Sequence, residues 1–127
     1  MLVNLRSGAT FTRVDSVDCY ERVGGSSLGV SFIWGVMRYL GKYTDPTAMC
    51  DAAIDGDSSK VDMSVADIYG GSYDGIGLPG ALLASSFGRL KDFSKDELDD
   101  SITGGDIARS LITMTVANVL VFSKTIA

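Results

Sequence analysis

The pattern of apolar and polar positions predicts three short strands at the beginning of the chain. Apolar residues gather in Leu2–Leu5 and alternate loosely with polar ones in Ala9–Val14, and the Ser-Gly pair between these runs is typical of a tight turn. The polar stretch Asp15–Asp18 indicates a second turn, and Cys19–Val23 predicts a third strand. Because short turns join antiparallel neighbours, we expect an antiparallel meander.

A glycine- and serine-rich segment, Gly24–Ser27, follows the third strand and predicts a flexible loop. The next stretch, Leu28–Leu40, is apolar on nearly every side, which predicts a buried helix with Ser26 or Ser27 as its N-cap. Free N–H groups at such a helix N-terminus could bind an oxyanion. The segment matches neither GxxxxGK[ST] nor GxGxxG, so an ordinary flexible linker is an equal alternative.

Helices, one strand and loops are predicted for the remainder. A helix begins at Thr44-Asp45-Pro46 and ends before Gly56, because proline suits the first turn and glycine the position after the last. Alternation in Val61–Ile68 predicts a strand, and the glycines of Gly70–Gly80 predict a loop. Ala81–Phe87 is expected as a short helix or irregular segment, Phe93–Asp100 as a loop or helical turn, and Thr103–Ala127 as a long helix capped by Thr103.

Length and composition favour one compact α/β domain. The chain has 127 residues, of which 46% are apolar and 21% charged, a globular balance. The first strand begins at once, and no strand follows the last helix, although such a helix normally leads into another strand. We therefore expect residues 1–127 to form a single partial domain that is incomplete at both ends.

The charge and the apolar runs argue against several classes of partner. A formal net charge of −5 leaves no basic footprint for nucleic acid. The longest apolar runs, Leu28–Met37 and Leu111–Phe122, are too short to span a bilayer, and there is no N-terminal signal, so we expect a cytoplasmic protein without a membrane partner. Cys19 and Cys50 are expected to be free, buried thiols.

Few residues suggest chemistry by their type and position alone. The chain has no histidine, so a general base would have to be a carboxylate, a lysine or a tyrosine. Arg22 could clamp a carboxylate or phosphate with two parallel hydrogen bonds, but an exposed arginine paired with a nearby acid is the commoner case. Ser7-Gly8 could form an anion-binding nest or an ordinary hairpin turn. No metal site is predicted, because the acids Asp55, Asp57, Asp62 and Asp67 do not have EF-hand spacing.

Five segments spread along nearly the whole chain are more specific together than any one of them. They are VNLRSGAT (Val3–Thr10), YERVGGSSLG (Tyr20–Gly29), GDSSKVDMSVADIYGG (Gly56–Gly71), GLPGALLASSFG (Gly77–Gly88) and DIARSLITMT (Asp106–Thr115). In this order and at similar spacing, they resemble the eukaryotic-type (type II) pantothenate kinases.

The resemblance implies a fold, a reaction and partners. The chain would be a segment of the C-terminal lobe of an actin-like (acetate and sugar kinase/Hsp70/actin) ATPase domain, in which ATP binds between two lobes. The family phosphorylates pantothenate to 4'-phosphopantothenate with ATP and Mg²⁺, the first step of coenzyme A biosynthesis. Its members are homodimers, and many are inhibited by acetyl-CoA.

The resemblance also assigns roles to individual residues. Ser7 and Thr10 match hydroxyl positions that bind pantothenate, with Thr10 in place of a serine. Arg22 matches an arginine that binds the pantothenate carboxylate and also the inhibitor. A glycine-rich loop beside the nucleotide phosphates corresponds to Gly24, Gly25, Ser26, Ser27 and Gly29.

Departures from the family pattern keep other readings open. Arg6 stands where the family usually has glycine, and Val30 and Ser31 replace two further glycines. The family's first phosphate loop, its catalytic glutamate and its adenosine-binding segment have no counterpart here, so we expect no catalytic residue and no activity of this chain alone. The alternatives are a degenerate kinase-like domain that binds or senses acyl-CoA, a self-associating structural domain, and a related kinase for another small substrate.

Overall fold

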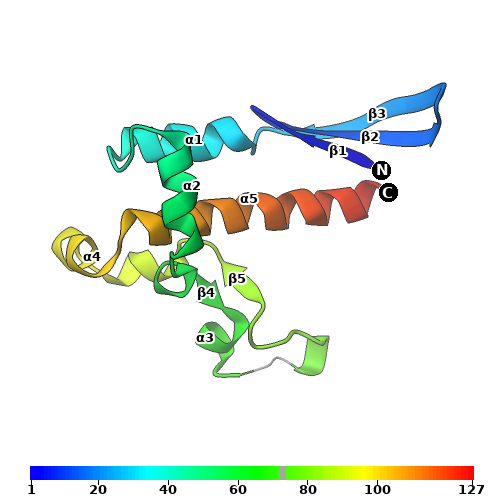
Figure 1. Ribbon diagram of the computed structural model, residues 1–127. Helices are drawn as coiled ribbons and strands as arrows, with labels where there is room; N and C mark the ends of the chain where they lie inside the picture. The colour runs from blue at the N-terminus through cyan, green and yellow to red at the C-terminus, as the bar shows by residue number, and fades with distance from the viewer. Residues whose placement is uncertain (72–73) are drawn as a thin grey trace. The chain divides into compact units, whose positions relative to one another are not determined.

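The computed structural model describes residues 1–71 and 74–127 of a mixed α/β chain (Figure 1). The chain divides into two compact units. One comprises Met1–Thr44 and Ile112–Ala127, and we call it the meander unit. The other, Asp45–Leu111, is the middle unit. The long helix α5 (Gly104–Ile126) contributes residues to both.

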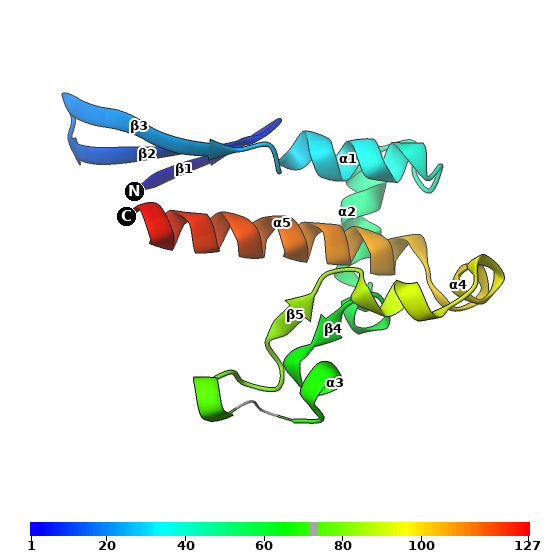
Figure 2. The same cartoon turned by 180° about the vertical axis from the view of Figure 1, so that it is seen from behind.

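The meander unit contains the predicted three-stranded antiparallel sheet, in the order β1-β2-β3 (Figure 2). Its strands are β1 (Leu2–Leu5), β2 (Ala9–Ser16) and β3 (Cys19–Ser26). Strand β3 is longer than predicted, because Gly24, Gly25 and Ser26 pair with β2. The predicted flexible loop Gly24–Ser27 is therefore wrong for its first three residues, which the β2 ladder holds in place.

The two faces of this sheet differ in polarity. On one face, buried Ala9 and Phe11 cluster with Val119 of α5, and the Phe11 ring lies 6.3 Å from that of Phe122. Side chains alternate along a strand, and Asn4 pairs with Thr10, so these two residues belong to the opposite face. The sheet therefore has an apolar face on the core and a polar face away from it.

A β-bulge at Val23 sets which residues of β3 reach the polar face. Arg22 pairs with Thr12, whereas Gly24 pairs with Phe11, so Val23 is an extra residue in β3. Val23 packs on the apolar cluster, and a Cβ on Gly24 would lie 3.2 Å from Ile126. The bulge thus keeps Val23 and Gly24 on the apolar face of the sheet and leaves Arg22 on the polar face.

Helix α1 (Val30–Tyr39) follows the meander and differs from its prediction in two ways. Its N-cap is Gly29, without a side-chain hydrogen bond, while the Ser26 hydroxyl accepts one from the N–H of Leu28 at 3.1 Å. The serine N-cap was thus wrong. Burial on all sides was also wrong, because only a stripe of two residues four apart, Ile33 and Met37, is buried.

The middle unit begins with helix α2 (Pro46–Ile54), as predicted. Asp45 caps it by accepting a hydrogen bond from the N–H of Thr47 at 2.9 Å. The strand predicted for Val61–Ile68 is mostly wrong, since β4 is only Met63–Ser64 and helix α3 (Val65–Tyr69) follows it.

A capping box explains that difference. The Ser64 hydroxyl accepts from the N–H of Asp67 at 3.2 Å, and the Asp67 carboxylate accepts from the N–H of Ser64 at 2.7 Å. These bonds begin a helix where alternation alone suggested a strand. Val61 and Val65, four residues apart, are both buried.

The second small sheet and the remaining helices complete the middle unit. Strand β5 (Leu83–Ser85) pairs antiparallel with β4, where a helix or irregular segment was expected. Of the predicted loop Gly70–Gly80, residues 72–73 lie outside the described residues, and 74–76 form a 3₁₀ turn. Further 3₁₀ turns are Ser58–Lys60 and Gly88–Asp92, and α4 is Lys95–Ser101, a helix that begins at a Ser94–Glu97 capping box.

The long helix α5 confirms the prediction for the end of the chain, with Thr103 at its start. The Thr103 hydroxyl accepts from the N–H of Asp106 at 3.2 Å. By length and composition alone α5 could cross a membrane, at a mean hydropathy of 1.3. Core helices pass the same test, and the buried residues of α5 recur every three or four positions, at Ala108, Leu111, Thr115 and Val119.

Both cysteines are free, as expected. The expectation that they are buried was wrong, because Cys19 and Cys50 are exposed. Cys19 lies at the start of β3, next to the tight turn after β2, and Cys50 lies on the open side of α2.

Candidate anion-binding pocket

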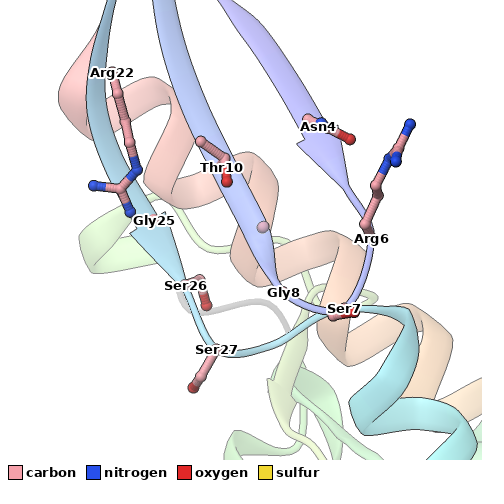
Figure 3. A pocket seen from close by; sticks show the side chains of 10 residues that line it. Asn4, Arg6, Ser7, Gly8, Thr10, Arg22, Gly25, Ser26 and Ser27 are labelled. Atoms are coloured by element: carbon pink, nitrogen blue, oxygen red, sulfur yellow. The ribbon is translucent and has the colours of Figure 1, made fainter.

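A pocket of about 490 Å³ lies on the polar face of the meander (Figure 3). It contains six of the eight residues for which the sequence predicted a binding role: Ser7, Thr10, Arg22, Gly25, Ser26 and Ser27. Asn4, Arg6, Gly8 and Ala9 complete the lining. Gly24 and Gly29 do not line it, because Gly24 belongs to the apolar face and Gly29 is buried.

Arg22 runs along β3 at one side of this pocket. Its guanidinium lies over Gly25, so close that a Cβ on Gly25 would overlap Nη2. Glycine at position 25 therefore leaves the space that the arginine side chain occupies. Thr10, which pairs with Gly25 across the ladder, presents its hydroxyl to the same pocket (Figure 3).

Among the residues that the structure describes, Arg22 differs from most arginines in making no ion pair or hydrogen bond. Four of the six arginines contact a partner. Arg13 forms ion pairs with Asp15 and Glu21, and Arg38 lies over the ring of Trp34. Arg89 forms an ion pair with Asp67 and donates to the Ser59 carbonyl, and Arg109 donates to the carbonyls of Ala53 and Ile54. Within residues 1–71 and 74–127, the guanidinium groups of Arg6 and Arg22 make no ion pair or hydrogen bond, and both line the pocket.

The backbone around the pocket is closely packed at Gly29. A Cβ there would lie 2.6 Å from the carbonyl oxygen of Arg6 and 2.6 Å from the Cα of Gly8. The N–H of Val30 donates to that same Arg6 carbonyl at 2.6 Å. Gly29 thus lets the segment between β3 and α1 cross the β1–β2 turn, which holds Ser7 near Ser26 and Ser27.

Sequence reasoning did not assign Asn4 or Arg6 to the pocket. Asn4 could have been found from the register, because it shares a face with its partner Thr10. Arg6 lies one residue beyond the end of β1, in the β1–β2 turn, so alternation along the strand does not place it. In the sequence, Arg6 was identified only as a residue that stands where the family usually has glycine.

Comparison with known proteins agrees with the resemblance. The Fumble family profile matches residues 1–127. This chain belongs to the Fumble family, the type II pantothenate kinases. It is 40% identical over 120 residues to pantothenate kinase 2 of Arabidopsis thaliana and 36% identical over 121 residues to the pantothenate kinase of Schizosaccharomyces pombe, with 94% of this chain covered in each.

A third relative has a different name. The 4'-phosphopantetheine phosphatase of Mus musculus is 39% identical over 106 residues, which cover 80% of this chain. The chain spans 13% of the mouse and Arabidopsis proteins and 30% of the Schizosaccharomyces protein.

The Fumble family implies an actin-like ATPase fold and the use of ATP and Mg²⁺. The pocket fits anionic groups, because it offers two guanidinium groups and several hydroxyls. It does not fit Mg²⁺, which takes carboxylate ligands, since no aspartate or glutamate lines it. Across the described residues no group of three or more metal-ligating side chains could hold a metal ion.

Proposed function

We propose that this chain supplies the pantothenate pocket of a pantothenate kinase, which phosphorylates pantothenate with ATP in coenzyme A biosynthesis. Arg22 binds the pantothenate carboxylate, and the hydroxyls of Ser7 and Thr10 bind its polar groups. Two relatives named pantothenate kinase, each aligned with 94% of the chain, support the reaction class.

The unpaired state of Arg22 is the observation that carries this proposal. A guanidinium without an acid partner, beside hydroxyls in a pocket, is free to bind a carboxylate with two parallel hydrogen bonds. Arg13, one strand away, is neutralised by Glu21 at 2.9 Å and Asp15 at 3.3 Å, so it has no such capacity. The contrast favours a binding role for Arg22 over a merely solvated one.

The same proposal limits what the chain does alone. No carboxylate in the pocket can act as general base, so the base and the Mg²⁺ ligands belong to other parts of the enzyme. In this proposal Gly24, Gly25, Ser26, Ser27 and Gly29 form the loop beside the ATP phosphates, a role that rests on the family resemblance alone. We expect binding without phosphoryl transfer. Homodimer formation, inhibition by acetyl-CoA and a cytoplasmic location complete the proposal through the family alone.

Calorimetric titration of the 127-residue chain with pantothenate tests the proposal. Arg22→Ala should weaken binding by about ten- to a hundred-fold, the loss expected for about 1.5–3 kcal/mol of charge-assisted hydrogen bonding. Arg22→Lys should retain only part of the binding affinity, because lysine keeps the positive charge but lacks the two parallel N–H donors of a guanidinium. Arg13→Ala is the matched control and should bind as the parent does. Equal losses in the two alanine variants, or no binding by the parent chain, would reject the pocket.

A second function is kept because one relative carries a phosphatase name. In this alternative the segment belongs to a kinase-like domain that binds a ligand, such as an acyl-CoA, without transferring phosphate. Titration of the full-length protein with ATP and with acetyl-CoA separates the two. Acetyl-CoA binding without ATP binding favours the alternative, and ATP turnover with pantothenate removes it.

A further inference from the structure

The second unpaired arginine, Arg6, lies across the pocket from Arg22. Figure 3 shows Arg22 along β3 on one side and Arg6 at the end of β1 on the other, with Thr10 on the strand between them. Both residues are exposed, but Arg22 belongs to the polar face of the sheet whereas Arg6 belongs to the β1–β2 turn at the edge of the pocket. The two guanidinium groups therefore stand at opposite sides of one pocket.

The backbone of Arg6 is fixed although its side chain is open. Its N–H donates to the Gly8 carbonyl at 2.8 Å, and its carbonyl accepts from the Val30 N–H at 2.6 Å. The position of Arg6 at the edge of the pocket is thus set by the β1–β2 turn and the start of α1. A side chain anchored in this way is suited to meet a ligand at one end of the pocket.

The charge of the pocket is opposite to that of the chain. The chain carries 16 acidic and 11 basic residues, yet the pocket lining contains two arginines and no acid. Two like charges in one pocket repel each other, and a ligand with an anionic group at each end relieves that repulsion. A ligand with a single carboxylate would leave one guanidinium without a partner.

We infer that the pocket prefers a ligand with two separated anionic groups, a carboxylate at Arg22 and a phosphoryl group at Arg6. The inference rests on the proposed function, because it takes Arg22 as the carboxylate partner. In the pantothenate class, the ligand with both groups is the ω-phosphorylated acid, which is the product of the kinase reaction. Arg6 then determines specificity and holds the product more tightly than the substrate.

A phosphoryl group could reach Arg6 from the phosphorylated acid or from a nucleotide. Calorimetry on the parent chain and on Arg6→Ala, Arg22→Ala and Arg13→Ala distinguishes the sources, with pantothenate, 4'-phosphopantothenate and ADP as separate ligands. We expect the parent chain to bind 4'-phosphopantothenate about tenfold more tightly than pantothenate, the gain from one charge-assisted contact. Arg6→Ala should remove that preference, so that the variant binds 4'-phosphopantothenate and pantothenate with about the same affinity.

The remaining outcomes separate this inference from the proposed function. Arg22→Ala should weaken both acids, and Arg13→Ala should change neither. If Arg6→Ala keeps the preference for the phosphorylated acid, or weakens only ADP, the inference fails while the pantothenate pocket stands. If the parent chain binds neither acid, the proposed function fails and this inference fails with it.

Discussion

The two units of the chain use polar groups in opposite ways. In the middle unit, the buried carboxylate of Asp62 accepts hydrogen bonds from the N–H of Phe87 at 2.9 Å and from the Ser110 hydroxyl. The buried carboxylate of Asp106 accepts from the N–H groups of Asp57 at 2.7 Å and Thr103 at 2.9 Å. Both acids lie inside the unit with their donors provided by the chain itself.

In the meander unit, two arginines are exposed and make no ion pair or hydrogen bond with any residue that the structure describes. Arg6 and Arg22 face a pocket in the described part of the chain without an acid to neutralise them. A buried polar group that is hydrogen-bonded within the chain contributes to stability, because a buried polar group without a hydrogen bond is costly. A charged group that the fold leaves open beside hydroxyls is available to a ligand. The comparison therefore distinguishes buried acids that stabilise the fold from exposed arginines that are available to bind a ligand.

The largest expected effect is the loss of Asp62, which should damage stability and spare the pocket. Asp62→Ala leaves the Phe87 N–H and the Ser110 hydroxyl without an acceptor, at a cost of about 3 kcal/mol in unfolding free energy. Phe87 also has a φ of 60°, an unfavourable conformation that this hydrogen bond helps to hold. Urea unfolding measures the loss. Asp62→Asn keeps one acceptor oxygen and should lose less, and an equal loss would contradict the account.

The second largest effect is expected for a substitution at Gly29. It should lower both stability and binding, because Gly29 packs against the β1–β2 turn that lines the pocket. In Gly29→Ala the new Cβ meets backbone atoms of the β1–β2 turn, which cannot move aside as a side chain can. We expect a loss of about 1–3 kcal/mol in unfolding free energy together with weaker pantothenate binding. Gly35→Ala in α1 is the control, because nothing lies within 4 Å of its Cβ position, and it should gain about 0.5–1 kcal/mol. Similar stabilities for the two variants would argue against close packing at Gly29.

The sequence predicted the meander well because its signals are local. Alternation in Ala9–Val14 and the turn at Ser7-Gly8 depend only on neighbouring residues. Gly24–Ser26 was missed because its place in β3 comes from pairing with β2, and glycines have no side chains whose alternation would indicate a strand. The strand predicted at Val61–Ile68 failed for a different reason, since the capping box at Ser64 outweighs a short alternating pattern.

The candidate site was partly predictable. The family resemblance indicated Ser7, Thr10 and Arg22, and the structure brings them to one pocket. Arg6 could not be assigned in the same way, because whether an arginine has an acid partner depends on which distant residues approach it. The β-bulge at Val23, which leaves Arg22 on the polar face, is equally invisible in the pattern.

A smaller effect should weaken binding without loss of stability. In Gly25→Ala the new methyl group occupies the space of the Arg22 guanidinium, a flexible group on an exposed side chain that can move away, and lies 3.2 Å from the Ala9 carbonyl oxygen, a contact that a small shift relieves. Pantothenate affinity should therefore fall about tenfold, while the free energy of unfolding should change by no more than about 0.5 kcal/mol, as it does for ordinary surface substitutions. Calorimetry and urea unfolding on the same sample measure the two quantities. A large loss of stability would show that β3 cannot accept alanine at this position.

The smallest effect is a pH dependence that belongs to the middle unit. Burial alone would raise the pKa of Asp106, but hydrogen bonds from the N–H groups of Asp57 and Thr103 hold that pKa below the ordinary value of an aspartate. A carboxyl whose pKa is lower in the folded chain stabilises that chain above its unfolded pKa, and the contribution is lost as pH falls through the folded pKa. The free energy of unfolding should therefore fall as the pH drops below about 4.

Asp106→Asn tests whether that pH dependence comes from this carboxylate. The variant should lose about 1 kcal/mol at pH 7, because asparagine accepts fewer hydrogen bonds, and its stability should change less with pH below 4. Asp51→Asn, at an exposed position in α2, is the control and should keep the parent's pH dependence. The lowered pKa values of Asp57 and Asp67, set first by hydrogen bonds from Ser59 and Ser64, also contribute, so the slope should shrink without vanishing. If Asp106→Asn followed the parent at every pH, Asp106 would not be a carboxylate that the fold stabilises, and the contrast between the two units would rest on Asp62 alone.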